Sequence, residues 1–166
     1  INKVEKIIGF KLTPDQLNAL KQINNDISSN ERMFRLLQGD VGSGKTIVSF
    51  ICAQQVINNN FQVAFMAPTE ILAKQHFDLY NKIFSSESNC DFLSGKTEYK
   101  KKTQILSKLK NNEINIIFGT HALFQKKINF KKLGLIIVDE QHKFGVKQRK
   151  KLSEDRKSTR LNSSHR

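Results

Sequence analysis

The chain contains no tryptophan, and cysteine, proline, methionine and tyrosine occur only twice each among its 166 residues. The two cysteines, Cys52 and Cys90, lack metal-ligand spacing, and both are expected to be reduced thiols of a cytoplasmic protein. No apolar run approaches the ~20 residues of a membrane span, so no spanning helix is predicted. No signal peptide opens the sequence, which begins without methionine and is expected to be truncated.

Acidic residues are also scarce, because 15 Asp and Glu stand against 28 Lys and Arg, which gives a formal charge of +13. The excess is spread along the chain and persists when residues 153–166 are set aside. A basic surface favours a polyanionic partner, although a lysine-rich composition that serves only solubility predicts the same charge. The length is sufficient for one domain with a hydrophobic core.

Short apolar runs alternate with helical patterns along the chain, and no internal repeat is visible. Because strand–helix alternation builds right-handed βαβ units, the predicted fold class is α/β, with a parallel sheet flanked by helices on both faces. Strands are predicted at residues 33–38, 62–67, 91–93, 114–118 and 135–139. Helices are predicted at residues 46–53, 69–84 and 99–110.

Two of these helices are predicted to be amphipathic. The apolar face of the helix at 69–84 is expected to contain Ile71, Leu72, Phe77, Leu79, Tyr80 and Ile83. The helix at 99–110 is expected to turn three apolar side chains inward, those of Ile105, Leu106 and Leu109. Its lysines are expected to face outward, namely Lys100, Lys101, Lys102, Lys108 and Lys110.

Residues 39–46 have the pattern G-x-x-x-x-G-K-T of a phosphate-binding loop. Its glycines let the backbone curl, so that successive N–H groups point at a polyphosphate. Lys45 adds a charge for the β- and γ-phosphates, and Thr46 offers a hydroxyl to Mg²⁺. The predicted strand before the loop and helix after it favour this interpretation over a chance glycine-rich turn. The predicted nucleotide-binding residues are Gly39, Asp40, Val41, Gly42, Ser43, Gly44, Lys45 and Thr46.

An acidic pair, Asp139 and Glu140, closes the last predicted strand. Ligands of parallel sheets bind at the carboxyl ends of the strands. Four segments each follow a predicted strand and are expected along one edge, namely the phosphate loop, residues 67–69, residues 119–121 and the acidic pair. Asp139 can hold Mg²⁺, usually through water, and Glu140 can orient and deprotonate the attacking water. A solvated acidic pair is common in isolation, but together with the phosphate loop it favours hydrolysis. The predicted catalytic residues are Lys45, Asp139 and Glu140, and the predicted metal ligands are Thr46 and Asp139.

Several segments together resemble superfamily 2 helicases and translocases. The sequence Asp139-Glu140-Gln141-His142 resembles motif II of that superfamily, and residues 39–46 resemble motif I. Similar segments stand at 67–76 for motif Ia, at 119–123 for motif Ib and at 10–16 for the adenine-reading segment. Over roughly residues 7–152 the sequence resembles the bacterial RecG family, through the segments GDVGSGKT, MAPTEILA, GTHALFQ and DEQHKFGV. Transcription-repair coupling translocases share GDVG and FGV, but they usually carry DEEQ and VPTT instead.

The resemblance implies roles for two residues outside the phosphate loop and the acidic pair. Gln16 is implied to select ATP over GTP, since its amide offers one donor and one acceptor to an adenine edge. A compatible alternative is that Gln16 lies in the first turn of a helix that Thr13 caps, with Pro14 at its first position. His142 is implied to couple the nucleotide site to the next motif.

The resemblance also implies DNA contacts where strands turn into helices, because exposed backbone N–H groups there can bind phosphates without reading bases. The implied DNA-binding residues are Pro68, Thr69, Gly119, Thr120 and His121. The alternative for the two threonines is ordinary helix capping. A set of lysines after motif Ib is either a solvated face or a further DNA contact, namely Lys126, Lys127, Lys131 and Lys132.

The implied function is an ATP-dependent DNA helicase or translocase that acts on branched duplex DNA, forks and junctions, with ATP and Mg²⁺ as cofactors. Residues 1–152 are expected to form the first RecA-like motor domain, and 153–166 a disordered or non-native tail that resembles translated sequencing adapter. The Ser-Ala-Thr motif, the second motor domain with its arginine finger and the wedge domain of such proteins are not in the sequence. The isolated chain is therefore expected to be weakly active or inactive. The alternatives are a transcription-repair coupling translocase and a non-catalytic nucleotide- or DNA-binding module.

Overall fold

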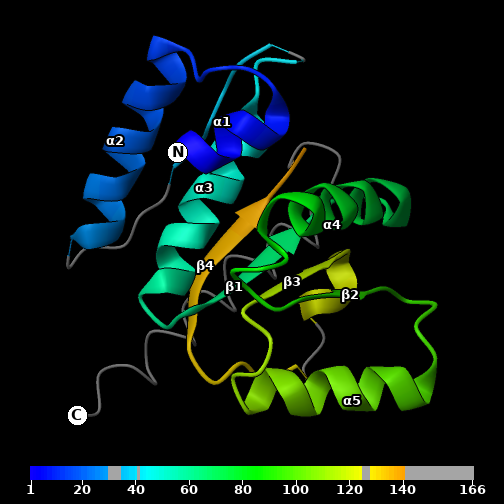
Figure 1. The fold of residues 1–166 in the computed structure, drawn as a ribbon. Helices are drawn as coiled ribbons and strands as arrows, with labels where there is room; N and C mark the ends of the chain where they lie inside the picture. Colours follow the sequence, from blue (N-terminus) through cyan, green and yellow to red (C-terminus); the bar gives the residue numbers. More distant parts are fainter. Residues whose placement is uncertain (30–34, 41, 125–127, 141–166) are drawn as a thin grey trace.

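A four-stranded parallel sheet lies at the centre of the computed structural model, which describes residues 1–29, 35–40, 42–124 and 128–140. The strand order is β2-β3-β1-β4, and all three pairings are parallel (Figure 1). The strands are β1 (Gln62–Met66), β2 (Cys90–Leu93), β3 (Ile116–Gly119) and β4 (Leu133–Val138). This arrangement confirms the predicted α/β fold class.

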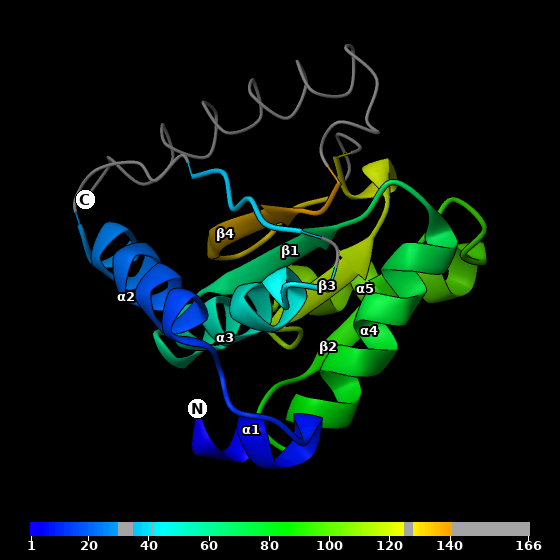
Figure 2. The ribbon, with the colours of Figure 1, turned by 90° about the horizontal axis from the view of Figure 1, so that it is seen from above.

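Helices cover both faces of the sheet (Figures 1 and 2). On one face lie α3 (Lys45–Asn58) and α4 (Glu70–Phe84), and on the other lies α5 (Tyr99–Lys110). On the outer side of α3 packs α2 (Pro14–Ser28), which follows α1 (Asn2–Ile8), a short helix that the sequence patterns did not predict. A 3₁₀ turn, η1 (His121–Phe124), begins two residues after the end of β3. Among the described residues, no helix has both the length and the apolar character needed to cross a membrane.

The core is divided into two layers by the alternation of side chains along the strands. On β1, Val63 and Phe65 join the cluster that packs against α3 and α4, whereas Ala64 and Met66 join the cluster that packs against α5. Every residue of β1 is buried. A strand with both faces covered cannot alternate apolar with polar side chains, which explains why β1 was recognisable only as a short apolar run.

Two threonines fix where α2 and α4 begin. Thr13 caps α2 in a capping box, in which its side chain accepts from the Gln16 N–H and the Gln16 side chain accepts from the Thr13 N–H. Thr69 caps α4 by accepting from the Leu72 N–H at 3.2 Å. Each cap satisfies N–H groups that have no partner inside the helix, so these starts are local properties of the sequence.

A buried glutamine connects three segments that are distant in sequence. Gln62 is fully buried, and its Nε2 donates to the carbonyl oxygens of Leu109 at 2.9 Å and Ile114 at 2.8 Å. Its Oε1 accepts from the Lys132 N–H at 3.0 Å. The end of α5, the approach to β3 and the entry to β4 are therefore held at one point beside β1.

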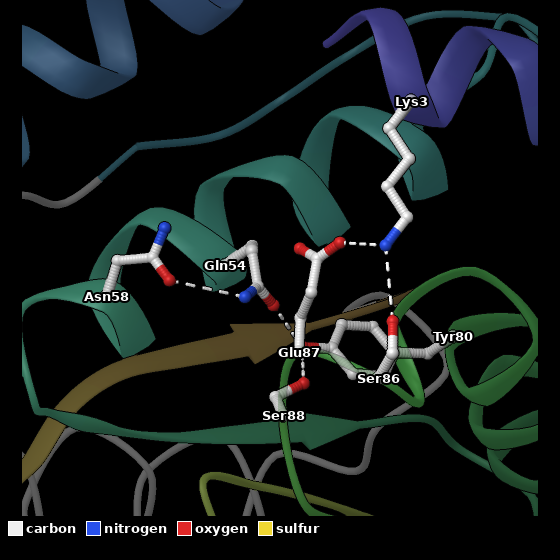
Figure 3. A network of polar contacts seen from close by, with 7 residues as sticks. All are labelled: Lys3, Gln54, Asn58, Tyr80, Ser86, Glu87 and Ser88. Carbon is white, nitrogen blue, oxygen red and sulfur yellow. Dashed lines mark hydrogen bonds and ion pairs between the residues drawn. The ribbon is translucent and has the colours of Figure 1, made fainter.

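A polar network joins α1, α3, α4 and the loop before β2 (Figure 3). The Tyr80 hydroxyl donates to Gln54 Oε1 at 2.9 Å and lies 2.9 Å from the Ser88 hydroxyl oxygen. At the surface, Lys3 forms an ion pair with Glu87. Gln54, Tyr80 and Ser88 are all buried, so their hydrogen bonds contribute more to stability than the exposed ion pair does.

The strand predicted at 33–38 is wrong for its described part. Residues 35–38 form no regular structure, and the side chain of Leu36 is 68% exposed. A strand requires a neighbour to complete its ladder of hydrogen bonds. Among the described residues the sheet ends at β4, and no strand is paired with residues 35–38.

The apolar face predicted for the helix at 69–84 is wrong at two positions. Ile71 is 74% exposed, and Leu79 is exposed as well. The buried stripe of α4 instead includes Ala73 and His76, together with Tyr80 and Ile83. This stripe follows the helical period from position 73, and Ile71 lies about 200° around the helix from it. Ala73 and His76 gave a weaker hydrophobic signal than the larger aliphatic side chains of Ile71 and Leu79.

In α5 the predicted inward position is confirmed for Ile105 and Leu109, while Leu106 is half-buried. Of the lysines expected on the outside, Lys102 is half-buried and the others are exposed.

Candidate nucleotide-binding site

Three strand ends meet at one edge of the sheet. The Ala67 N–H donates to the Gly119 carbonyl at 3.0 Å, and the Asp139 N–H donates to the Met66 carbonyl at 2.8 Å. These bonds place the segments after β1, β3 and β4 side by side, as expected for the carboxyl ends of parallel strands. The prediction of a shared edge is confirmed for these three segments.

The phosphate loop turns directly into α3. Gly42 and Gly44 have φ angles of +83° and +79°, a region that residues with a Cβ rarely adopt. Gly44 is also the N-cap of α3, and its carbonyl accepts from the N–H groups of Ile47 and Val48. The loop therefore needs glycine at both positions, and it leads directly into the N-terminus of a 14-residue helix, a position that favours anions. Val41 lies outside the described residues.

The ammonium group of Lys45 is held inside the loop. Its Nζ donates to the carbonyl oxygens of Gly39 at 2.6 Å and Asp40 at 2.8 Å, and it lies 3.5 Å from Ser43 Oγ. Carbonyl oxygens are weaker partners for an ammonium group than anionic phosphate oxygens are. The arrangement is one in which an incoming polyphosphate would replace these contacts.

The Asp139 carboxylate contacts a histidine of α4, and its Oδ2 lies 2.7 Å from His76 Nε2. The hydrogen bond from His76 holds the pKa of the Asp139 carboxyl below its ordinary value, against partial burial, which acts in the opposite direction. The charge of His76, the N–H of Glu140 and the charge of Lys45 lower this pKa further. Asp139 is therefore ionised at neutral pH.

Glu140 follows with a φ of +49°, an unusual backbone conformation for a residue with a side chain. Such conformations typically cost of order 1 kcal/mol or more and persist where the surroundings enforce them. The roles of Asp139 and Glu140 in metal holding and water activation stay predictions.

The donor set at this edge suits Mg²⁺. Thr46, in the first turn of α3, offers a hydroxyl, and Asp139 offers an ionised carboxylate, both of which are hard oxygen donors. Within the described residues, no group of three or more His, Cys, Asp and Glu side chains forms a metal cage. Proteins usually hold Mg²⁺ through one or two oxygen-bearing side chains together with phosphate oxygens and water.

Gln16 contacts the phosphate loop in this structure. Its Nε2 donates to the Ser43 carbonyl at 2.7 Å, while its Oε1 accepts from the Thr13 N–H at 2.9 Å. The predicted capping role is confirmed, and the predicted contact with adenine stays a prediction. No local sequence pattern predicts the contact with Ser43, because it joins residues 27 positions apart.

The residues predicted to contact DNA differ in exposure. Thr69 and His121 are exposed, Pro68 is half-buried, and Gly119 and Thr120 are buried. The capping alternative is confirmed for Thr69, which does not prevent the free N–H groups of the same turn from binding phosphate. Lys131 and Lys132 are exposed. His142, Lys126 and Lys127 lie outside the described residues.

The comparisons with known proteins agree with this geometry. The family model described as DEAD/DEAH box helicase matches residues 13–166. The chain is similar to the ATP-dependent DNA helicase RecG of Aquifex aeolicus, with 44% identity over 155 residues, which cover 93% of this chain and 20% of that protein. RecG of Thermotoga maritima is 48% identical over 148 residues, covering 89% of this chain and 19% of that protein.

Solved structures show the same fold. The structure titled RecG bound to three-way DNA junction matches with a TM-score of 0.78 and 46% identity, covering 85% of this chain and 20% of that chain. The UvsW helicase from bacteriophage T4, at 20% identity and a TM-score of 0.64, shares the fold alone; the match covers 86% of this chain and 47% of that one. The chain spans about a fifth of the length of its RecG relatives. Both the RecA-like fold and the resemblance to RecG are confirmed, and the chain belongs to the DEAD/DEAH box helicase family.

Proposed function

We propose that this chain is the nucleotide-binding half of a RecG-type DNA motor, which uses ATP and Mg²⁺ to act on branched DNA during replication-fork repair and recombination. One observation carries the proposal. Lys45 of the phosphate loop opens α3, and Asp139 directly follows β4, a strand against which α3 packs. This combination supports phosphoryl chemistry, because the two groups address the metal and the phosphates of the same nucleotide.

The residues of the site then have distinct roles. The N–H groups of the loop and Lys45 bind the β- and γ-phosphates, and Thr46 and Asp139 hold Mg²⁺. A bound Mg²⁺ would neutralise part of the phosphate charge. Glu140 orients the attacking water and accepts its proton. Gln16 selects adenine, for which it must exchange its present contact with Ser43.

DNA binding is assigned to the same edge of the sheet. The relative of known structure is bound to a three-way DNA junction, and the turns after β1 and β3 lie beside each other here. N–H groups at the start of α4, with the exposed Thr69 and His121, would contact the phosphate backbone. The excess of basic residues would strengthen such binding at low salt.

The test is nucleotide binding by the 166-residue chain, measured with a fluorescent ATP analogue. Lys45→Ala is expected to weaken binding at least 10-fold, because it removes a charge-assisted contact worth roughly 1.5–3 kcal/mol. Lys108→Ala is the matched control, since Lys108 is exposed on α5. Equal affinities for the two variants would refute the assignment of the loop.

A second measurement separates a motor from a passive nucleotide sensor. In the RecG-type parent protein, Glu140→Gln is expected to leave ATP binding intact and to abolish DNA-stimulated phosphate release. Retained turnover would contradict the role of Glu140. The isolated chain is expected to hydrolyse ATP very slowly, because the arginine finger of this superfamily comes from the second motor domain and its absence costs roughly 10³–10⁵ in rate.

A further inference from the structure

The Asp139 carboxylate is hydrogen-bonded to a side chain from the middle of α4. His76 Nε2 lies 2.7 Å from Asp139 Oδ2, although 63 residues separate them in sequence. His76 is 7% exposed, so water competes little for this bond. No motif assigned a function to this histidine, which stands at the end of the segment resembling motif Ia.

The position of the His76 ring is fixed by aromatic neighbours. Its centroid lies 5.0 Å from that of Phe65 on β1 and 6.3 Å from that of Phe50 on α3, and it meets Phe50 edge-on at 89°. A ring packed in this way has little freedom to rotate. Its Nε2 is thus aimed at Asp139 by the core and not by a flexible loop.

The carboxylate, by contrast, stands on the first residue after a strand. Asp139 is half-buried, and it precedes the strained turn at Glu140. A carboxylate at such a position can rotate about its side-chain bonds unless a partner holds it. Groups that hydrogen-bond to a metal-binding carboxylate orient it, and their loss typically reduces metal affinity about 10- to 100-fold.

We propose that His76 is a positioning residue, which donates its Nε2–H to Asp139 and keeps that carboxylate oriented toward the metal of the bound nucleotide. This inference rests on the proposed function, specifically on Asp139 as a metal ligand. The opposing interpretation is that His76 is a core histidine that uses Asp139 only to satisfy its own N–H. The two interpretations differ in what happens to metal binding when the ring stays and the donor is removed.

His76→Phe makes this separation, because phenylalanine retains an aromatic ring among Phe50 and Phe65 but has no N–H. His76→Gln does the reverse, since its amide Nε2 reaches about as far as the imidazole Nε2. His76→Asn carries the same amide on a shorter side chain and is the matched control for reach. Circular dichroism melting of each variant establishes that it is folded.

The measurement is the affinity of the 166-residue chain for a fluorescent ATP analogue, first in EDTA and then in saturating Mn²⁺. The ratio of the two dissociation constants reports how strongly the protein engages the metal. In His76→Phe this ratio is expected to fall roughly 10-fold, with the affinity in EDTA unchanged. His76→Gln is expected to retain most of the ratio and His76→Asn to lose it. A merely structural role for His76 would not produce rescue by the longer amide.

Asp139→Asn is measured in parallel to distinguish two kinds of failure. If Asp139→Asn lowers the ratio while His76→Phe and His76→Asn leave it at the original value, the inference about His76 is wrong and the proposed function stands. If Asp139→Asn has no effect on the ratio, the metal assignment is wrong and the inference falls with it. If His76→Phe does not fold, the comparison of glutamine with asparagine decides, and equal ratios for these two variants overturn the proposal.

Discussion

The hydroxyl of Tyr80 offers a sensitive test of the packing between α3 and α4 (Figure 3). Tyr80 is 0% exposed, and its hydroxyl is bonded to both Gln54 and Ser88 at 2.9 Å. Tyr80→Phe removes only the hydroxyl. The ring keeps its aromatic neighbours Phe50, Phe84 and Phe118, whose centroids lie 4.9–5.3 Å away.

The cost follows from the groups left behind. Gln54 and Ser88 are buried, so water cannot readily replace the lost partner. A buried polar group without a partner costs about 1–3 kcal/mol, and Gln54 keeps its other contact with Asn58. We expect Tyr80→Phe to lower the free energy of unfolding by about 2–3 kcal/mol. Adding Gln54→Leu is expected to cost less than the sum of the single changes, because each removes the same bond.

Urea unfolding followed by circular dichroism is the suitable assay, since the chain has no tryptophan and the substitution removes one of its two tyrosines. In thermal unfolding of a domain of this size, Tyr80→Phe should lower the melting temperature by roughly 4–12 °C. Tyr99→Phe is the matched control, because Tyr99 is 86% exposed and its substitution should change stability by less than about 0.5 kcal/mol. Equal effects of the two substitutions would refute the reasoning about Tyr80.

Two further predictions concern stability. Gly119→Ala should lower the free energy of unfolding by about 3 kcal/mol, because a Cβ there would overlap the Leu93 carbonyl oxygen and no rotamer change relieves this. At Gly95 an added Cβ meets nothing closer than 4.0 Å, so Gly95→Ala should be nearly neutral in the same unfolding assay. Burial raises the pKa of Tyr80, so the folded chain retains a proton that the unfolded chain loses above about pH 10. Stability should therefore fall above that pH by up to about 1.4 kcal/mol per unit more steeply than in Tyr80→Phe, and parallel pH profiles would contradict this.

Much of the fold was predictable because its signals are local. The phosphate loop, the cap at Thr13 and the helix at Tyr99–Lys110 each depend on residues within a few positions of one another. The strand at 62–67 was recognisable as an apolar run between turns, and β1 occupies Gln62–Met66. The failures occurred where burial depends on the rest of the molecule. Ile71 is apolar yet exposed, whereas His76 is polar yet buried, since the face of α4 that meets the sheet is set by packing.

The chemistry proposed for the nucleotide site was predictable from the amino-acid sequence. Its residue types and spacings indicate phosphate binding at 39–46 and a carboxylate pair at Asp139 and Glu140, because such motifs act through neighbouring backbone atoms and side chains. Which distant groups meet there depends on how the chain folds. The fold brings His76 to Asp139 and Gln16 to Ser43, across 63 and 27 residues. Parallel strands and the helices between them create these contacts, and no local pattern records them.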